Sequence, residues 1–290
     1  MTHYSLLIGS SGGGFAATSF VELTSGSSTF SVPTGYNAIH IQYAVGGGGG
    51  AAGGADYDKA GGESAGAGGG SGAFISDKIF SVTELETITY SVGSGGAPGN
   101  QTSNFNQPRI ADAGTNTTLS GSTTGSLFTL GAGGGSSGTG GGVQGPVRTN
   151  TAGTAGTATI DGTAITSGIF TDSDNSIKNV TSNTSGPTSV FNESGNGAAG
   201  NISGDVGQGP GNCVGDNCQI GGSNGADSYD GNISGGAGSP VGTSTNGSAG
   251  TRGSGGGGGG AQYGPGSTLG AAGGNGEIKY RFLQIGRAHV

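Results

Sequence analysis

Few residues in this chain of 290 have the types and spacing that catalysis or metal binding requires. The three histidines, His3, His40 and His289, lie far apart, and no His/Cys spacing suits zinc. No serine has the flanking pattern of a nucleophile elbow. Gly-x-Gly-x-x-Gly matches occur because glycine is abundant, and none follows a strand pattern and opens a helix. We therefore expect no catalytic residue, no metal site and no cofactor, and a protein that is not an enzyme.

The two cysteines, Cys213 and Cys218, are close in sequence. Two thiolates are too few for a tetrahedral zinc site. Gly215, Asp216 and Asn217 between them favour a tight turn, so the pair is a disulfide candidate of the kind found outside reducing compartments. Two reduced thiols in a loop are the alternative, and the sequence does not decide between them.

Four aromatic residues stand among Gly, Asn, Asp and Ser, where no apolar periodicity explains them: Tyr57, Phe105, Tyr229 and Tyr263. Tyrosine beside Ser, Gly and Asn is typical of adaptable binding loops, and aromatic rings also stack on other rings, sugars among them. We interpret these residues as receptor-binding candidates. The alternative is that each ring covers the end of a glycine-rich layer.

Glycine dominates the composition with 73 residues, whereas charged residues make up 9% and hydrophobic residues 30%. Ordinary domains have about 7% glycine and about 25% charged residues, so the composition argues against an ordinary enzyme domain. Long helices are also excluded, because each interior glycine costs about 1 kcal/mol relative to alanine. The net charge of −8 without any Lys/Arg run gives no reason to bind nucleic acid. No stretch approaches the ~18 apolar residues of a membrane span, so we expect no membrane insertion.

Alternating apolar and polar residues predict short strands near both ends of the chain. The clearest, over residues 38–45, places Ile39, Ile41, Tyr43 and Val45 on one face and the even-numbered residues on the other. Further strands are predicted over 18–23, 28–32, 73–76, 78–82, 86–92, 127–130 and 277–282, with a turn or bulge at Asp77.

The predicted fold class is all-β: a small antiparallel β-sandwich core built from N- and C-terminal strands, with a long glycine-rich middle packed as polyglycine-II-like helices and loops. A three-residue repeat of glycine near residue 153 matches the pitch of a polyproline-II-type helix, although a disordered linker has the same composition. The expected organisation is a lead segment at 1–17, the β core at 18–92 and the glycine-rich layer at 93–276, with a glycine-poor insertion near 158–196. A closing strand at 277–283 follows, and residues 284–290 are interpreted as an artefact for the reason given below.

Several motifs occur in a fixed order along the chain. Residues 29–36 read TFSVPTGY, Val45 precedes five glycines, residues 88–99 read ITYSVGSGGAPG, and residues 273–280 read GGNGEIKY. This order resembles the glycine-rich domain of bacteriophage tail and tail-fibre proteins over roughly residues 25–283. The resemblance implies an adhesin in the virion tail, with polyglycine-II helices that present loops to a host-surface glycan or outer-membrane protein. It also implies other tail-fibre subunits as partners.

Two alternatives to a phage adhesin remain at this point. One is a cellular extracellular fibre or matrix protein whose glycine bundle is purely structural, and a more distant one is an ice-binding protein. Residues 285–290, IGRAHV, look like the in-frame translation of a common sequencing adapter. We therefore interpret residues 284–290 as an artefact of assembly from metagenomic reads, with a genuine basic tail as the alternative.

Overall fold

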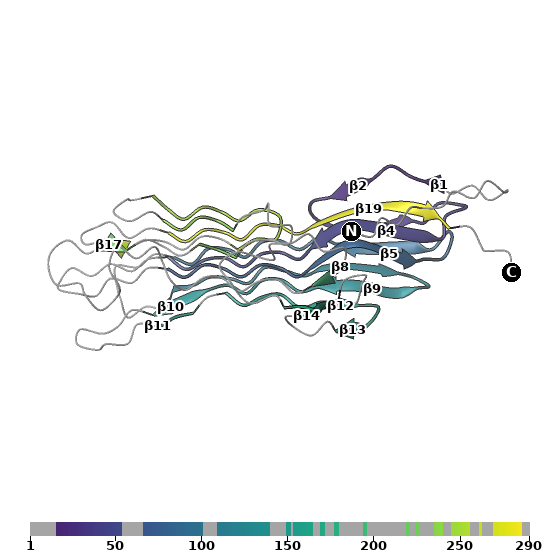
Figure 1. The fold of residues 1–290 in the computed structure, drawn as a ribbon. Helices are drawn as coiled ribbons and strands as arrows, with labels where there is room; N and C mark the ends of the chain where they lie inside the picture. Colours follow the sequence, from purple (N-terminus) through teal and green to yellow (C-terminus); the bar gives the residue numbers. More distant parts are fainter. Residues whose placement is uncertain are drawn as a thin grey trace.

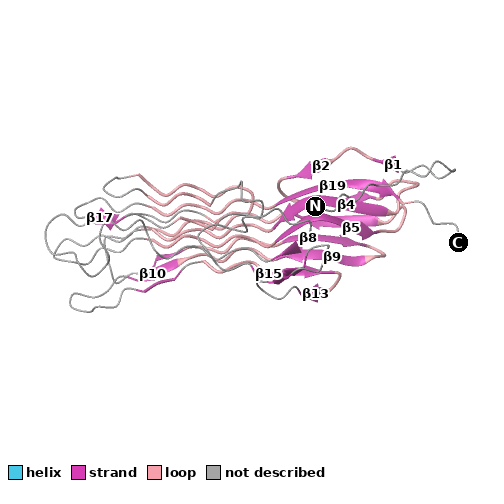
Figure 2. Cartoon of the chain, viewed as in Figure 1, coloured by secondary structure: helices cyan, strands magenta, loops and turns pink. Residues whose placement is uncertain are grey.

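The long β-strands gather at one end of an elongated molecule, and extended segments continue from them to the other end (Figure 1). In this computed structural model, strands and loops make up the described chain (Figure 2). The structure describes residues 16–53, 66–100, 109–139, 149–151, 153–164, 169–171, 177–179, 194–195, 219–220, 224–226, 235–239, 245–255, 261–262 and 269–285. Within these ranges, no helix is long and apolar enough to cross a membrane.

Sheet A places the C-terminal strand between strands from the start of the chain. Its order is β1-β19-β4-β5-β16, and β2 also pairs with β19. The bounds are β1 Ala16–Ala17, β2 Val21–Leu23, β4 Ala38–Val45, β5 Phe74–Ser81, β16 Ser194–Gly195 and β19 Glu277–Gln284. The prediction that the terminal strand returns to the N-terminal set is confirmed, because β19 pairs antiparallel with β1, β2 and β4.

Sheet B has the order β13-β12-β9-β8-β6-β3, with every pair antiparallel. The bounds are β3 Ser27–Ser31, β6 Thr87–Ser91, β8 Thr117–Gly121, β9 Gly125–Leu130, β12 Ala158–Ile160 and β13 Thr163–Ala164. Smaller sheets combine β7 Arg109–Ile110, β10 Ser137–Thr139 and β11 Thr149–Thr151, then β14 Ile169–Thr171 with β15 Ile177–Asn179, and β17 Gln219–Ile220 with β18 Ala261–Gln262. The all-β prediction is confirmed.

The hydrophobic core lies between the two sheets. Ile41 of β4 and Ile278 of β19 in sheet A belong to the same buried cluster as Leu119 of β8 in sheet B. Phe30 of β3 stacks on Tyr280 of β19, with ring centroids 4.7 Å apart and planes 9° from parallel. Burial of each such side chain contributes about 1.5–3 kcal/mol, so the sandwich holds most of the apolar stabilisation of the molecule.

Strand β4 contains a bulge at Gln42, where its register against β19 shifts by one residue. A one-residue shift reverses the face that each following side chain takes. The prediction that Tyr43 and Val45 share the face of the preceding isoleucines is therefore wrong, and Ala44 joins the core instead. The expected irregularity at Asp77 is present in β5, where that residue has a left-handed φ of 53°.

The glycine-rich segment 46–53, here called the central segment, continues from β4 into a bundle. Its successive amides donate in turn to three different neighbours, 66–73, 109–116 and 269–276. Every third amide returns to the same neighbour, and the acceptor carbonyls there also step by three residues. The donors Gly46, Gly49 and Ala52 bond to the carbonyls of Ala73, Gly70 and Ala67, respectively. In the same way, Gly47 and Gly50 bond to Thr115 and Asp112, and Gly48 and Ala51 bond to Gly274 and Ala271. Three residues per turn is the polyproline-II pitch, so the central segment is a polyglycine-II helix.

Six ring segments surround the central segment, and each is hydrogen-bonded through its backbone to both of its neighbours in the ring. Their order is 66–73, 131–136, 109–116, 93–100, 269–276 and 253–255. Segments that run toward the sandwich alternate around this ring with segments that run away from it. The described part of the glycine-rich middle is thus an ordered bundle rather than a linker.

The sandwich and the bundle are interleaved along the chain. Segments 46–53 and 66–73 of the bundle fall inside the range 18–92 assigned to the β core, whereas β8, β9 and β12 come from the range assigned to the glycine-rich layer. The two regions meet at Thr117, which is fully buried. Its Oγ1 accepts from the amide of Gly93 at 2.9 Å and donates to the carbonyl of Val45 at 2.8 Å.

Glycine is required in the bundle because neighbouring backbones approach too closely for a side chain. A Cβ on Gly48 would overlap the carbonyl oxygen of Ser254, and one on Gly49 would overlap that of Gly134. Non-bonded heavy atoms normally stay about 3.5–4 Å apart. Since the obstructing atoms are backbone, a rotamer change cannot relieve the overlap.

Replacement of Gly49 by alanine tests this packing. We expect Gly49→Ala to lower the free energy of unfolding by about 3 kcal/mol or more, the upper end for an overpacked core. Ala97→Ser, at an exposed ring position, is the matched control and should change it by less than about 0.5 kcal/mol. Urea unfolding followed by circular dichroism measures both, and equal stability of the two variants would contradict the packing argument.

Glu86 holds two turns together at the outer end of sheet B. Its buried carboxylate accepts from the amide of Thr83 at 2.7 Å, from the amides of Thr123 and Thr124 at 3.0 Å each, and from the Thr124 hydroxyl at 2.5 Å. Burial alone would raise the pKa of Glu86, but these hydrogen bonds outweigh it and lower the pKa below its ordinary value.

The lowered pKa makes the contribution of Glu86 depend on pH. We expect Glu86→Gln to cost about 1.5–3 kcal/mol at neutral pH, the range for hydrogen bonds to charged groups. A lowered carboxyl pKa contributes stability above the unfolded pKa of about 4.3, and this is lost as pH falls through the folded pKa. The stability gap between wild type and variant should therefore narrow below about pH 4.3. Exposed Glu84→Gln is the control, and a gap unchanged at pH 3 would refute this account.

Candidate functional site

The residues proposed from the sequence as binding or disulfide candidates all lie outside the described residues: Tyr57, Phe105, Cys213, Cys218, Tyr229 and Tyr263. Their predicted roles therefore stay predictions. The described segments on either side of the aromatic residues nevertheless have known directions. These directions show whether the chain runs toward or away from the sandwich before and after each candidate.

Three of the four aromatic candidates follow segments that run away from the sandwich and precede segments that return. Tyr57 lies between 46–53 and 66–73, whose bond from Ala52 to Ala67 marks the far end of the bundle. Phe105 lies between the ring segments 93–100 and 109–116, and Tyr263 follows β18 and precedes 269–276.

Tyr229 is flanked in the opposite sense. Asn224 lies beside Gly68, and the amide of Ala226 donates to the carbonyl of Gly69 at 3.0 Å. The segment 224–226 is therefore parallel to 66–73 and runs toward the sandwich. The segment before Tyr229 therefore runs in the opposite direction to the segments before the other three candidates. The sequence alone could not reveal this difference.

At the far end of the bundle, the structure describes one fully buried cation. The Nη1 of Arg109 donates to the carbonyl of Gly53 at 2.6 Å. Burial lowers the pKa of Arg109 to about 10, so the guanidinium is still charged at neutral pH. A positive charge therefore sits where the central segment ends.

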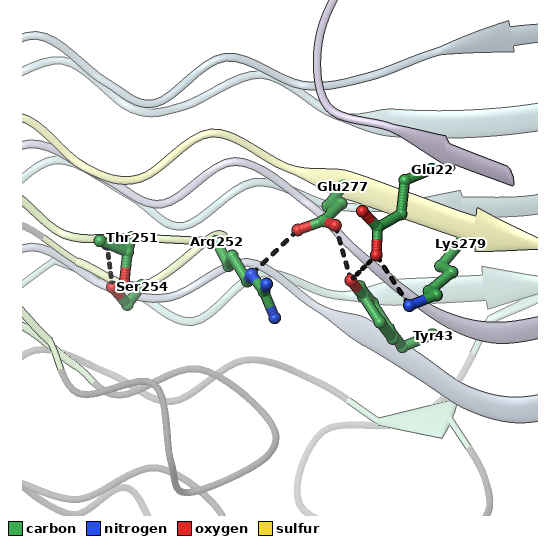
Figure 3. A network of polar contacts seen from close by, with 7 residues as sticks. All are labelled: Glu22, Tyr43, Thr251, Arg252, Ser254, Glu277 and Lys279. Atoms are coloured by element: carbon green, nitrogen blue, oxygen red, sulfur yellow. Dashed lines mark hydrogen bonds and ion pairs between the residues drawn. The ribbon is translucent and has the colours of Figure 1, made fainter.

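A polar network covers the outer face of sheet A where the sandwich meets the bundle (Figure 3). We define the outer-face network as Glu22 of β2, Tyr43 of β4, Glu277 and Lys279 of β19, and Arg252 of the turn at residues 251–254. The bulge of β4 turns Tyr43 outward, and the alternation of β19 brings Glu277 and Lys279 to the same face.

The Tyr43 hydroxyl lies between two carboxylates. It is 2.6 Å from Glu277 Oε1 and 3.3 Å from Glu22 Oε1. Burial, together with the bond to Glu277, raises the pKa of Tyr43 well above its ordinary value, so the hydroxyl stays protonated and donates. The hydrogen bond and charge of Lys279 lower the pKa of Glu22.

Two ion pairs complete the network. Arg252 Nε lies 3.2 Å from Glu277 Oε2, and Lys279 Nζ lies 2.8 Å from Glu22 Oε1. Both cations also face the ring of Tyr43, at 5.7 and 5.8 Å from its centroid, which is cation–π distance. The two ion pairs fasten β2 and the turn to β19.

The same face continues along the sheet to His40. The Arg281 guanidinium lies 4.6 Å from the Phe20 ring centroid, and its Nε donates to His40 Nδ1 at 3.1 Å. Nδ1 is therefore an acceptor, which assigns the ring proton to Nε2, 2.5 Å from Asp77 Oδ1. The outer face thus forms a row of alternating rings and charges from Asp77 to Arg252.

Among the described residues, this row of side chains holds β2, β4, β19 and the turn at residues 251–254 together. Thr251 donates its amide to Ser254 Oγ at 2.7 Å and closes the turn, in which Arg252 has a left-handed φ of 41° (Figure 3). Such strain persists where the surroundings hold it in place, here through Glu277. No three His, Cys, Asp or Glu side chains gather to hold a metal ion in the part of the chain that the structure describes.

Sequence reasoning did not find this network. The alternation of β19 could have pointed to Glu277 and Lys279, but Arg252 sits in a Gly-rich stretch with no strand pattern. The uniform alternation before Tyr43 concealed the bulge, and so it hid the central member of the network.

A comparison with known families covers the sandwich and the bundle together. The model of a family described as "Glycine-rich domain" matches residues 23–283, from the end of β2 to the penultimate residue of β19. The chain belongs to this glycine-rich domain family. No curated protein matches the sequence. The family match begins and ends in adjacent strands of sheet A, and every described segment of the bundle lies within it.

Removal of the Tyr43 hydroxyl tests the network. We expect Tyr43→Phe to lower the free energy of unfolding by about 1–3 kcal/mol, because the buried carboxylate of Glu277 loses a donor. Tyr36→Phe is the matched control, since that ring packs beside Phe282, and should change it by less than about 0.5 kcal/mol. Chemical unfolding measures both variants. Indistinguishable values would show that the hydroxyl has no part in the network.

Proposed function

We propose that this protein is a structural and receptor-binding component of a phage tail fibre, which attaches the virion to a host-surface glycan or protein through loops. The proposed location is the virion tail, and the proposed partners are a host receptor and other tail-fibre subunits. A cellular extracellular fibre with a purely structural bundle is the second candidate.

One observation carries the proposal. The bundle extends from a rigid sandwich, and the stretches with Tyr57, Phe105 and Tyr263 each join segments that run away from the sandwich to segments that return. A rigid scaffold with aromatic residues in its connections is a common arrangement for binding. The order of sequence motifs that resembles phage tail proteins favours the phage assignment over a general adhesin. Membership of the glycine-rich domain family agrees with the glycine-rich bundle that this resemblance implies.

Alanine substitution of the aromatic candidates tests receptor binding. We expect the labelled protein to adsorb to at least one strain in a panel of candidate host bacteria. The triple variant Tyr57→Ala/Phe105→Ala/Tyr263→Ala should bind at least about tenfold more weakly, the loss typical of interface hot spots. Tyr229→Ala is the comparison, because the segment that precedes Tyr229 runs toward the sandwich. Equal adsorption of the triple variant and wild type would refute the role of these residues.

The location of the protein distinguishes a phage tail fibre from a cellular extracellular fibre. Antibodies raised against the protein should label the tails of phage particles from the same source in immunogold electron microscopy. Label confined to cell envelopes or extracellular fibres would favour the cellular fibre and overturn the phage assignment.

A further inference from the structure

Several backbone amides at the outside of the bundle donate to side chains rather than to another segment. In an extended polyglycine-II array, an outward amide would bond to the next segment out, as the amides of the central segment do. Here an exposed side chain of an adjacent segment supplies the acceptor instead. The acceptor–donor pairs are Asn116 Oδ1 with Ala132, Thr115 Oγ1 with Ser94, Asn275 Oδ1 with Gly95, Asn224 Oδ1 with Gly238 and Asn246 Oδ1 with Leu269.

The geometry of these contacts is that of ordinary hydrogen bonds. Asn275 Oδ1 lies 2.9 Å from the Gly95 amide, and Asn116 Oδ1 lies 3.1 Å from the Ala132 amide. The Asn246 oxygen lies 3.0 Å from its donor. All three asparagines are exposed, so their amide groups lie over the surface of the bundle.

Polar side chains inside the bundle act differently. Buried Ser136 accepts from the amide of Ala52 at 2.8 Å and donates to the carbonyl of Ala67 at 2.5 Å, so one hydroxyl joins three segments. The interior hydroxyl of Ser136 thus joins three segments, whereas each exposed side chain accepts from one amide at the surface of the bundle. The difference is one of position within the bundle, since both use short side chains that reach the neighbouring backbone.

We propose that these exposed side chains are rim caps that stop lateral growth of the bundle by a second copy of this chain. A row of backbone amides without acceptors is a template for another chain, and sheet proteins block such edges with bulky or charged residues. A glycine-rich surface has few such residues to use. Each rim cap occupies one donor itself, so the caps interrupt the rows of amides to which a second copy could bond along the described surface of the bundle.

The inference does not rest on the proposed function, because it concerns association between copies rather than attachment to a host. It implies that the bundle has a defined width set by where asparagine and threonine stand in the sequence. Loss of a rim cap should leave the monomer folded, since water can solvate an exposed amide, but should open a lateral edge.

The test is a triple variant, Asn116→Ala/Asn246→Ala/Asn275→Ala. Sedimentation velocity of the full chain over a range of concentrations should give a single species for wild type and concentration-dependent association for the variant. The control carries Asn100→Ala/Ser248→Ala/Thr251→Ala, which are also exposed bundle residues, and should behave as wild type. Circular dichroism and the unfolding midpoint establish that each variant is folded. A folded triple variant that sediments as wild type does, or a wild type that associates equally, would overturn the proposal.

Amide hydrogen exchange on the unmodified protein gives a second readout that does not depend on how the variants fold. The amides of Gly95, Ala132 and Leu269 should exchange at least about tenfold more slowly than unstructured amides, since each has a protein acceptor. Exchange at unprotected rates would show that the caps do not hold, and would overturn the proposal whatever the variants do.

Discussion

The whole molecule depends on one constraint: backbones that satisfy each other's hydrogen bonds in three directions must lie too close together for most side chains. The central segment meets this constraint by donating to three neighbours in strict rotation. A Cβ at Gly48 or Gly49 would overlap a neighbouring carbonyl oxygen. Glycine is therefore the residue that makes the bundle possible, although it is also the residue that loses most conformational entropy on folding.

The entropy cost explains why the bundle is continuous with a sandwich. Glycine segments bury almost no apolar side chains, so hydrophobic burial alone would not order them. Strands β4, β5, β6, β8, β9 and β19 each lead into or out of a bundle segment, and the core between the sheets fixes their spacing and direction. Thr117 and the outer-face network then fasten the junction. The pairing of the strands in the sandwich therefore sets how the bundle segments align with one another.

Local periodicity was enough to predict β2, β3, β4, β5, β6, β9 and β19, because apolar alternation reports which faces are buried. It missed β8 and the remaining short strands, whose sequences carry no clear apolar alternation. It failed at Gln42, since Ile39 to Tyr43 alternates without interruption and nothing at Gln42 itself marks a bulge. Composition could not separate a bundle from a linker, because both have the same residues and differ only in how distant segments align. The outer-face network was out of reach for the same reason, as Tyr43 and Arg252 meet only after the bundle has formed.

The abundance of small polar residues follows from the same constraint as the abundance of glycine. A side chain in or beside the bundle must be short enough not to separate the segments and polar enough to bond to a backbone group. Serine, threonine and asparagine meet both conditions, as Ser136 does in the interior and Asn275 at the rim. A disordered linker would use these residues for solubility alone and would have no need to place them at particular positions. Here their positions decide where segments join and where the array ends, so the composition that first suggests disorder is what specifies the order.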